Sequence, residues 1–324
     1  MEYFALKNPN GSILRFVQSY NESNAVKRES MVLDWFDHQS PVIGKAKKQQ
    51  VFKKYDSQLN FDINLIDKIF LELGWMTYIV KPLLSERFDV LVKNRLLKDD
   101  SGVIKLTELG EFLFQQNEYN QYTKSLTFKA NFWKKNNVKI TDNNEIGSGA
   151  FIGKNIIVTC KHVLDELNKE KLIIEDESKK RYTVKNILRH PDDNVDLVKI
   201  FTVEYFDFFT YEIETSVKLI ESVVIFGYPP IPLATEAFLI ANLGEVSSEV
   251  DNYLDGTDCI ILSVITRPGN SGGPVINENG KLIGVMVQNR QHKMLITGEN
   301  IDNVDFNKGL GYATALKAKY INEF

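Results

Sequence analysis

Cysteine is almost missing from this chain: among 324 residues, only Cys160 and Cys259 are cysteines. Disulfide-dependent secreted proteins carry more, so we expect both thiols to be reduced, although the sequence leaves a bridge between them open. The four histidines show neither the i, i+4 spacing nor the Cys-x-x-Cys partners of zinc sites. No phosphate-binding loop ending in Gly-Lys-Ser or Gly-Lys-Thr is present. The sequence therefore predicts no metal and no cofactor.

Long apolar runs are missing too. No stretch is long enough to cross a bilayer as a helix, and residues 1–8 lack the basic segment and apolar stretch of a secretory signal. These absences lead us to expect a cytoplasmic protein. A hydrophobic fraction of 43%, a charged fraction of 25% and a formal net charge of −4 predict a sizeable core and two domains. This charge requires neither a membrane nor a nucleic acid as partner.

A serine set between glycines is the most informative feature that is present. The segment reads Gly269-Asn270-Ser271-Gly272-Gly273-Pro274. Glycines permit the positive φ and the close backbone approach that such a loop requires. The loop can present the Ser271 hydroxyl, together with the N–H groups of Gly269 and Ser271, to one carbonyl group, which is what acyl transfer needs. Taken alone, the same pattern also fits an ordinary tight turn.

Two further segments supply the partners that a serine nucleophile needs. The apolar run Ile156-Ile157-Val158 leads through Thr159-Cys160-Lys161 to His162, which predicts a buried strand that delivers this histidine at its end. Asp196 opens the alternating run Leu197-Val198-Lys199-Ile200, so we expect it to point inward toward an imidazole. Asp192 and Asp193 compete for this role, but they lie in a turn cluster where acidic residues are normally solvated.

Three motifs stand in the order His, Asp, Ser: Thr159-Cys160-Lys161-His162, Asp196-Leu197-Val198 and Gly269-Asn270-Ser271-Gly272-Gly273-Pro274. In this order they resemble the trypsin-like serine peptidases of the chymotrypsin fold, and in particular their bacterial heat-shock-protease branch. The resemblance covers roughly Leu126 to Phe324. It implies an all-β domain of two six-stranded barrels with a catalytic triad in the cleft between them.

The resemblance assigns roles to single residues. Ser271 attacks the scissile carbonyl, His162 takes and returns its proton, and Asp196 fixes the imidazole tautomer. Gly269 and Ser271 form the oxyanion hole. Ile265, six residues before the serine, and Thr266 fall at the floor of the specificity pocket, which implies cleavage after small or medium uncharged residues. The stretch 289–308 could instead fold over the pocket and contribute Glu299, Asp302 or Asp305.

The first part of the chain differs in kind. Apolar residues recur at helical spacing at Ile66, Ile69, Phe70 and Leu73, at Leu84, Phe88 and Leu91, and at Leu109, Phe112 and Leu113. Between the last two helices, residues 96–107 predict two short strands around an Asp-Ser-Gly turn. This order of elements resembles a winged helix-turn-helix. We therefore expect an α+β protein with a helical segment at 1–60, a winged-helix-like adaptor at 61–118, a polar linker at 117–124 and a peptidase domain at 126–324.

The charge of the first part bears on its partner. Residues 1–125 carry 17 Lys and Arg against 16 Asp and Glu, a net charge of +1. Because phosphate neutralisation dominates affinity for nucleic acids, so neutral a domain favours protein docking over DNA binding. The sequence thus predicts a cytoplasmic serine endopeptidase that acts on proteins or peptides, is recruited or regulated through its N-terminal part, and by analogy serves in bacterial stress or antiphage defence. The alternative is a transcriptional regulator or peptide-sensing module with a peptidase-like domain.

Overall fold

The computed structural model describes residues 10–11, 14–15, 17–18, 88–100, 103–142, 144–251, 256–287, 295–296, 299–300 and 312–324. The chain divides into two compact units, Met1–Ser125 and Leu126–Phe324. Most of the predicted helical segment 1–60, and the first helix predicted for the winged-helix-like part, lie outside the described residues. The predicted domain boundaries therefore stay predictions.

The first unit contains the predicted hairpin and the helix after it. Strands β1 (Leu97–Asp100) and β2 (Val103–Leu106) pair antiparallel. Helix α6 (Glu108–Gln115) follows at once, because the Thr107 hydroxyl accepts the N–H of Gly110 and caps its first turn. Its apolar face buries Leu109 and Leu113. The hairpin and this helix are thus confirmed, whereas the complete winged-helix arrangement is not.

The predicted linker is in part a helix. Helix α7 (Tyr119–Lys124) occupies most of residues 117–124, and its Tyr119 and Tyr122 are buried. Tyr119 also packs against Phe114, with the two ring centroids 5.7 Å apart. The linker prediction is wrong because two tyrosines three residues apart share one helix face, a pattern too short to stand out among polar neighbours.

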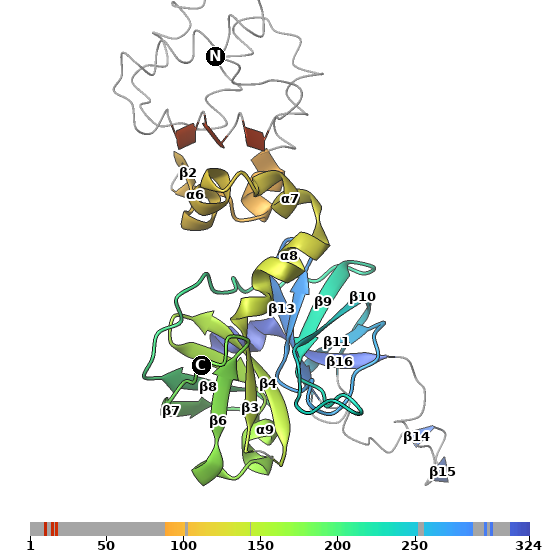
Figure 1. The fold of residues 1–324 in the computed structure, drawn as a ribbon. Helices are drawn as coiled ribbons and strands as arrows, with labels where there is room; N and C mark the ends of the chain where they lie inside the picture. The colour runs from red at the N-terminus through yellow and green to blue at the C-terminus, as the bar shows by residue number, and fades with distance from the viewer. Residues whose placement is uncertain are drawn as a thin grey trace, which may run out of the picture. The chain divides into compact units, whose positions relative to one another are not determined.

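The second unit begins with helix α8 (Leu126–Trp133) and a 3-10 turn, η1 (Lys134–Asn136). A six-stranded antiparallel sheet follows, in the order β6-β3-β4-β5-β8-β7 (Figure 1). Its strands are β3 (Asn137–Thr141), β4 (Ile146–Gly153), β5 (Ile156–Thr159), β6 (Ile173–Asp176), β7 (Val184–Arg189) and β8 (Val198–Thr202). An isolated antiparallel bridge pairs Glu175 of β6 with Arg181, which lies between β6 and β7. Between β5 and β6 lie α9 (Lys161–Glu166) and the 3-10 turn η2 (Lys169–Lys171).

The second sheet closes on itself as a barrel in the order β10-β11-β16-β13-β12-β9. Its strands are β9 (Ser222–Gly227), β10 (Ile240–Asp251), β11 (Asp258–Leu262), β12 (Pro274–Asn277), β13 (Leu282–Val287) and β16 (Ala313–Lys317). Aliphatic side chains fill the interior, among them Val223, Ile225, Ile260 and Ile283. A short hairpin of β14 (Leu295–Ile296) and β15 (Glu299–Asn300) precedes β16, and a final 3-10 turn, η3 (Ala318–Glu323), follows it. The predicted β-barrel fold, with two sets of six strands, is confirmed; the second sheet closes as a barrel, whereas the strand pairing of the first is that of a six-stranded sheet.

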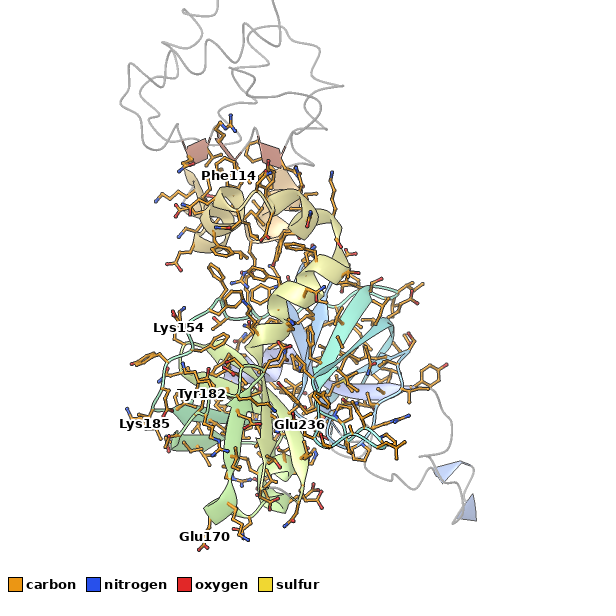
Figure 2. The ribbon with its side chains drawn as sticks, in the orientation of Figure 1. Phe114, Lys154, Glu170, Tyr182, Lys185 and Glu236 are labelled. Atoms are coloured by element: carbon orange, nitrogen blue, oxygen red, sulfur yellow. The ribbon has the colours of Figure 1, made fainter. Side chains whose placement is uncertain are left out.

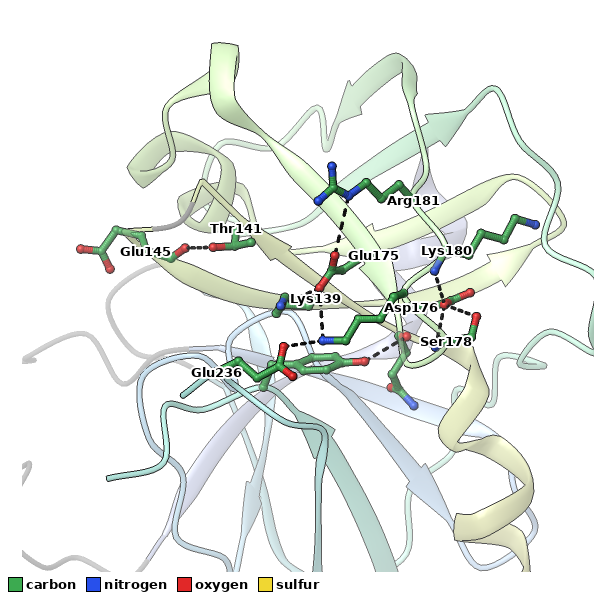
Figure 3. A network of polar contacts seen from close by, with 12 residues as sticks. Lys139, Thr141, Glu145, Glu175, Asp176, Ser178, Lys180, Arg181 and Glu236 are labelled. Atoms are coloured by element: carbon green, nitrogen blue, oxygen red, sulfur yellow. Dashed lines mark hydrogen bonds and ion pairs between the residues drawn. The ribbon is translucent and has the colours of Figure 1, made fainter. Parts of the chain in front are cut away.

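A polar network fixes the turn between β6 and β7 (Figure 3). Glu175 receives the ammonium of Lys139 at 2.7 Å, and both side chains are largely buried. Lys179 joins Glu175 at 3.7 Å and Glu236 at 2.5 Å. Because Glu236 lies in the connection between β9 and β10, this network links the turn to a loop of the second barrel.

Among the described helices, none is long and apolar enough to span a membrane.

Candidate active site

His162 lies in the first turn of a short helix directly after a buried strand. Strand β5 ends at Thr159, Cys160 takes the N-cap position of α9, and His162 follows two residues later. The Thr159 hydroxyl donates to the carbonyl of Ser148 on β4 at 2.6 Å, which fixes the end of the strand. His162 therefore lies three residues after the end of β5, close to the strand end where the sequence predicts it.

Asp196 holds this imidazole with both carboxylate oxygens. Its Oδ2 lies 2.5 Å from His162 Nδ1, and its Oδ1 accepts the His162 backbone N–H at 3.0 Å. The two side chains are only 14% and 13% exposed, so water screens the pair weakly. By contrast, Asp192 and Asp193 are exposed. The structure therefore brings Asp196, and neither of its two competitors, to the histidine.

The Ser271 loop depends on its glycines. Gly269 and Gly272 have φ values of +93° and +81°, which favour glycine. A Cβ on Gly272 would lie 2.1 Å from the carbonyl oxygen of Ser148, and one on Gly273 would lie 2.0 Å from that of Phe226. These separations are far below van der Waals contact. The loop can pack this closely against both sheets only with glycines at these positions.

Ser148 joins the serine loop to the first sheet. Its hydroxyl donates to the carbonyl of Gly269 at 2.6 Å and accepts the N–H of Tyr228 at 2.9 Å, while its own N–H donates to the carbonyl of Ser271 at 2.8 Å. On the other side, Gly272 N–H donates to the carbonyl of Met286 on β13 at 2.8 Å. The Ser271 loop is thus anchored to both sheets. The sequence did not reveal this role of Ser148, because its contact with Gly269 spans 121 residues.

His162 and Ser271 line one cavity of about 130 Å³. Its other walls come from three segments, with the lining residues Glu145, Ile146, Gly147, Val163, Glu166, Leu167, Pro268 and Gly269. Ser271 is only 9% exposed, so its hydroxyl is reached through this cavity. His162, Ser271 and an opening to solvent therefore occur together.

Backbone donors are free where an oxyanion would form. Within the part of the chain that the structure describes, the N–H groups of Gly269 and Ser271 donate to no protein acceptor. Both residues belong to the cavity wall. Uncommitted N–H groups beside a nucleophile are suited to stabilise a developing negative charge.

The predicted specificity residues lie elsewhere. Ile265 is 74% exposed, and neither it nor Thr266 lines the cavity of Ser271. The side chains of the alternative residues Glu299, Asp302 and Asp305 are outside the described residues. The structure thus brings together His162, Asp196, Ser271 and Gly269 but not the predicted pocket floor, whose role stays a prediction.

A larger cavity, of about 550 Å³, lies on the first sheet away from these residues. Its walls include Phe206, Phe208 and Tyr182, the last of which is labelled in Figure 2. The carboxylate of Asp176 in its wall already accepts four donors: the N–H and hydroxyl of Ser178, the N–H of Lys180 and the Tyr182 hydroxyl. Because these hydrogen bonds give the Asp176 carboxylate a structural role, we take the smaller cavity, with His162 and Ser271, as the candidate active site.

Comparison with known proteins agrees with this geometry. The family described as "Trypsin-like peptidase domain" matches residues 147–285, which include His162, Asp196 and Ser271. This chain carries a trypsin-like peptidase domain. The family is one of serine proteases, so the prediction of a peptidase is confirmed at the level of the family.

The similarity to individual proteins is low in sequence identity. A protein of Chlamydia trachomatis named "Probable periplasmic serine endoprotease DegP-like" is 29% identical over 143 residues, which is 43% of this chain and 27% of that protein. The chain thus matches about a quarter of that relative's length.

Among solved structures, an inactive form of Rv3671c from M. tuberculosis has 20% identity and a TM-score of 0.43, covering 60% of this chain and 86% of its own. The serine endoprotease from Yersinia pestis has 16% identity and a TM-score of 0.46, covering 62% of this chain and 65% of its own.

Proposed function

We propose that this protein is a serine endopeptidase whose nucleophile is Ser271. The observation that carries the proposal is the 2.5 Å contact between His162 Nδ1 and Asp196, with His162 and Ser271 lining one cavity. A carboxylate on Nδ1 keeps the proton there, which leaves Nε2 as the basic nitrogen. Membership of the domain in the trypsin-like peptidase family supports the same conclusion.

The proposed hydrolysis of a peptide bond proceeds in the following steps. His162 Nε2 takes the hydroxyl proton as Ser271 Oγ bonds to the peptide carbonyl carbon, and the N–H groups of Gly269 and Ser271 receive the oxyanion. Collapse of the tetrahedral intermediate breaks the C–N bond, and the imidazolium returns its proton to the leaving amine. Water, deprotonated by the same Nε2, then hydrolyses the acyl-enzyme and releases Ser271.

A fluorophosphonate probe tests the assignment directly, because it phosphonylates only an activated serine. The full-length protein should be labelled, and Ser271→Ala should not be. Ser263→Ala is the matched control, since Ser263 is exposed and does not line the cavity of Ser271. Labelling or peptide cleavage that persists in folded Ser271→Ala would refute Ser271 as the nucleophile.

We further propose that the N-terminal part recruits or regulates the peptidase through a protein partner. Its net charge of +1 supports protein over DNA as the partner, and the chain's pairing of such a part with a peptidase is consistent with a stress or antiphage-defence effector. The rival proposal, a transcriptional regulator with a peptide-sensing domain, predicts tight operator binding with a steep dependence on salt. Duplex-DNA binding by the full chain at physiological salt distinguishes the two.

Two finer proposals concern the substrate and the compartment. We propose cleavage after small or medium uncharged residues, as the apolar Ile265 suggests; profiling with a peptide library tests it, and a preference for Lys or Arg would contradict it.

We also propose a cytoplasmic site of action. The support is that the chain has two cysteines, both of which are buried and neither of which forms a disulfide. Fractionation of cells that express the native gene tests this location.

A further inference from the structure

Cys160 lies beside the His162–Asp196 pair in an arrangement that the proposed mechanism does not use. One ligand atom each from Cys160, His162 and Asp196 lie within 4.8 Å of one another. Cys160 is completely buried, and its thiol donates to the Met286 carbonyl at 3.2 Å. A soft sulfur donor therefore stands next to an imidazole and a carboxylate, with a carbonyl oxygen close to the sulfur.

This donor set fits one class of metal. Thiolate, imidazole and carboxylate together are ligands of zinc, whose bonds to sulfur, nitrogen and oxygen are about 2.0–2.3 Å long. Two ligands of one tetrahedral zinc ion lie roughly 3.3–3.8 Å apart, so a span of 4.8 Å needs only small inward movements. The His162–Asp196 contact of 2.5 Å would have to widen, because the ion enters between these groups. Magnesium and calcium, which prefer oxygen ligands, are excluded by the sulfur.

We propose that Cys160, His162 and Asp196 bind a divalent cation of the zinc class, and that this ion holds the peptidase in an inactive state. The inhibitory effect of the ion rests on the proposed peptidase function. The ion-binding site itself rests only on the geometry of the three side chains. Since His162 Nδ1 faces Asp196, it is the nitrogen that the ion takes.

The inhibition follows from the proton balance. Before binding, the imidazole carries its proton on Nδ1 and offers the lone pair of Nε2 to Ser271. When the ion takes the Nδ1 lone pair, the neutral ring must carry its proton on Nε2, and the thiol releases its own proton to solvent. Nε2–H cannot accept the hydroxyl proton of Ser271, so no acyl-enzyme forms. Removal of the ion by a chelator reverses both changes without any cofactor or oxidant.

A structural role for Cys160 is the competing explanation. Its hydrogen bond to Met286 connects the α9 N-terminus to β13, and a small buried thiol also packs well there. Cys160→Ser separates the two roles, because a serine hydroxyl keeps a hydrogen-bond donor of similar size but is a poor ligand for zinc. Cys259→Ser is the matched control: Cys259 is the other cysteine, also buried and not in a disulfide, and it lies on β11.

Cobalt(II) provides a readout that does not depend on activity, because thiolate coordination produces a charge-transfer absorption in the near ultraviolet. We expect this band on titrating the reduced full-length protein and Cys259→Ser with CoCl2, and expect zinc to displace it. Folded Cys160→Ser, checked by thermal melting, should lack it. If the wild type shows no thiolate band, or Cys160→Ser retains it, the site is refuted. If Cys160→Ser is unfolded, Cys160→Ala gives the same comparison. The absence of a thiolate band in the wild type refutes the site without any variant.

The second arm measures inhibition of peptide turnover by ZnCl2, with each variant compared with its own rate in EDTA. Loss of the sulfur ligand should raise the inhibitory zinc concentration of Cys160→Ser by roughly 10- to 100-fold, whereas Cys259→Ser should match the wild type. Equal inhibition of wild type and Cys160→Ser would refute the inhibitory role. If turnover is absent in EDTA while the cobalt band is present, the proposed function fails and the ion site stands, so the two failures can be distinguished.

Discussion

The proton on the imidazole of His162 is held in place by Asp196. Both oxygens of Asp196 are used: Oδ2 receives Nδ1–H, and Oδ1 receives the backbone N–H of His162. The second bond fixes where the carboxylate lies, and the first fixes the tautomer. The contact of Asp196 with Nδ1 therefore determines whether Nε2, on the other side of the ring, is free to accept a proton.

Replacement of Asp196 by Asn tests this dependence. The amide nitrogen can donate to Nδ1, which moves the ring proton to Nε2, so kcat should fall by about 10⁴-fold with little change in thermal stability. Steady-state hydrolysis of a peptide substrate measures the loss. Asp193→Asn, a change at an exposed acid in the same loop, should stay close to wild type. An active Asp196→Asn enzyme would contradict the assigned tautomer.

Gly272 is the residue whose substitution the loop should tolerate least. In Gly272→Ala the new Cβ would meet Ser148 O at 2.1 Å and Thr159 Oγ1 at 2.2 Å, in addition to a backbone strain of roughly 1–2 kcal/mol at positive φ. We expect loss of fluorophosphonate labelling and a stability loss well above the strain alone. Gly256→Ala is the control, because φ there is +69° but a Cβ has nothing within 4 Å. Equal denaturant midpoints for the two variants would contradict the steric argument.

At the scale of elements, a buried lysine connects the helix that carries His162 to the loop that carries Asp196. Lys161, at the start of α9, donates from Nζ to the carbonyl of Asp192 at 2.8 Å, and it is only 8% exposed. His190 supports the same loop: its Nδ1 accepts the N–H of Asp192, and its ring meets that of Phe324 edge to face at a centroid distance of 4.9 Å. The loop is therefore held from two sides.

Lys161→Met should remove the hydrogen bond to the Asp192 carbonyl while preserving most of the buried aliphatic volume. We expect kcat to fall roughly 10- to 100-fold with KM nearly unchanged, because a shifted Asp196 misplaces the base but not the substrate. Lys161→Arg, which can still donate, should recover part of the rate. A change confined to KM would contradict a positioning role, and so would a pH profile of kcat/KM identical to that of the wild type.

Asp142 fixes the loop that forms another wall of the active-site cavity. Backbone N–H groups, that of Glu145 first and then those of Asn168 and Asn144, lower the pKa of Asp142 from 3.8 to about 2. A carboxyl whose pKa is lower in the folded state stabilises the fold above its unfolded pKa and loses this effect as the pH falls through its folded pKa.

Asp142→Asn should therefore be less stable than wild type at neutral pH, and the difference should shrink between about pH 4 and pH 2. Thermal melting across this range measures it. Asn144→Asp, an added carboxyl in the same loop, controls for a general response of the loop to acid. A difference in melting temperature that stays constant down to pH 2 would contradict the assigned pKa.

At the scale of the whole molecule, all groups assigned to the chemistry belong to the second unit. His162 lies in α9 after β5, Asp196 lies in the loop before β8, and Ser271 lies in the loop before β12, which Ser148 of β4 holds by hydrogen bonds. A site assembled from two sheets requires both to be folded. The described residues that line the cavity of Ser271 run from Glu145 to Ser271 and all belong to the second unit.

A chain reduced to residues 126–324 should consequently fold and hydrolyse a small peptide at close to the full-length rate, because the cut falls between the two compact units. Cleavage of a natural protein target should drop if the removed part recruits it. Turnover of a short fluorogenic peptide by both chains tests the first statement. An insoluble fragment would show that the two units share a core.

The sequence determined the local chemistry of this protein. A β-branched run followed by His162, an aspartate at the start of an alternating segment, and a serine among glycines are each encoded within a few neighbouring residues, as are the β1–β2 hairpin and α6. Backbone preference and apolar periodicity act over such distances, so these features could be predicted; the catalytic roles drawn from them stay predictions.

Contacts between segments that are far apart in the chain follow from the packing of the folded protein. The contacts of Ser148 with Gly269, of Lys161 with Asp192 and of Cys160 with the His162–Asp196 pair join segments that are between 31 and 121 residues apart or depend on the packing of one sheet against another. No local propensity encodes such pairs. They arise because burying the apolar faces of two sheets brings the ends of β4, β5 and β13 to one place, where the few polar groups must satisfy one another.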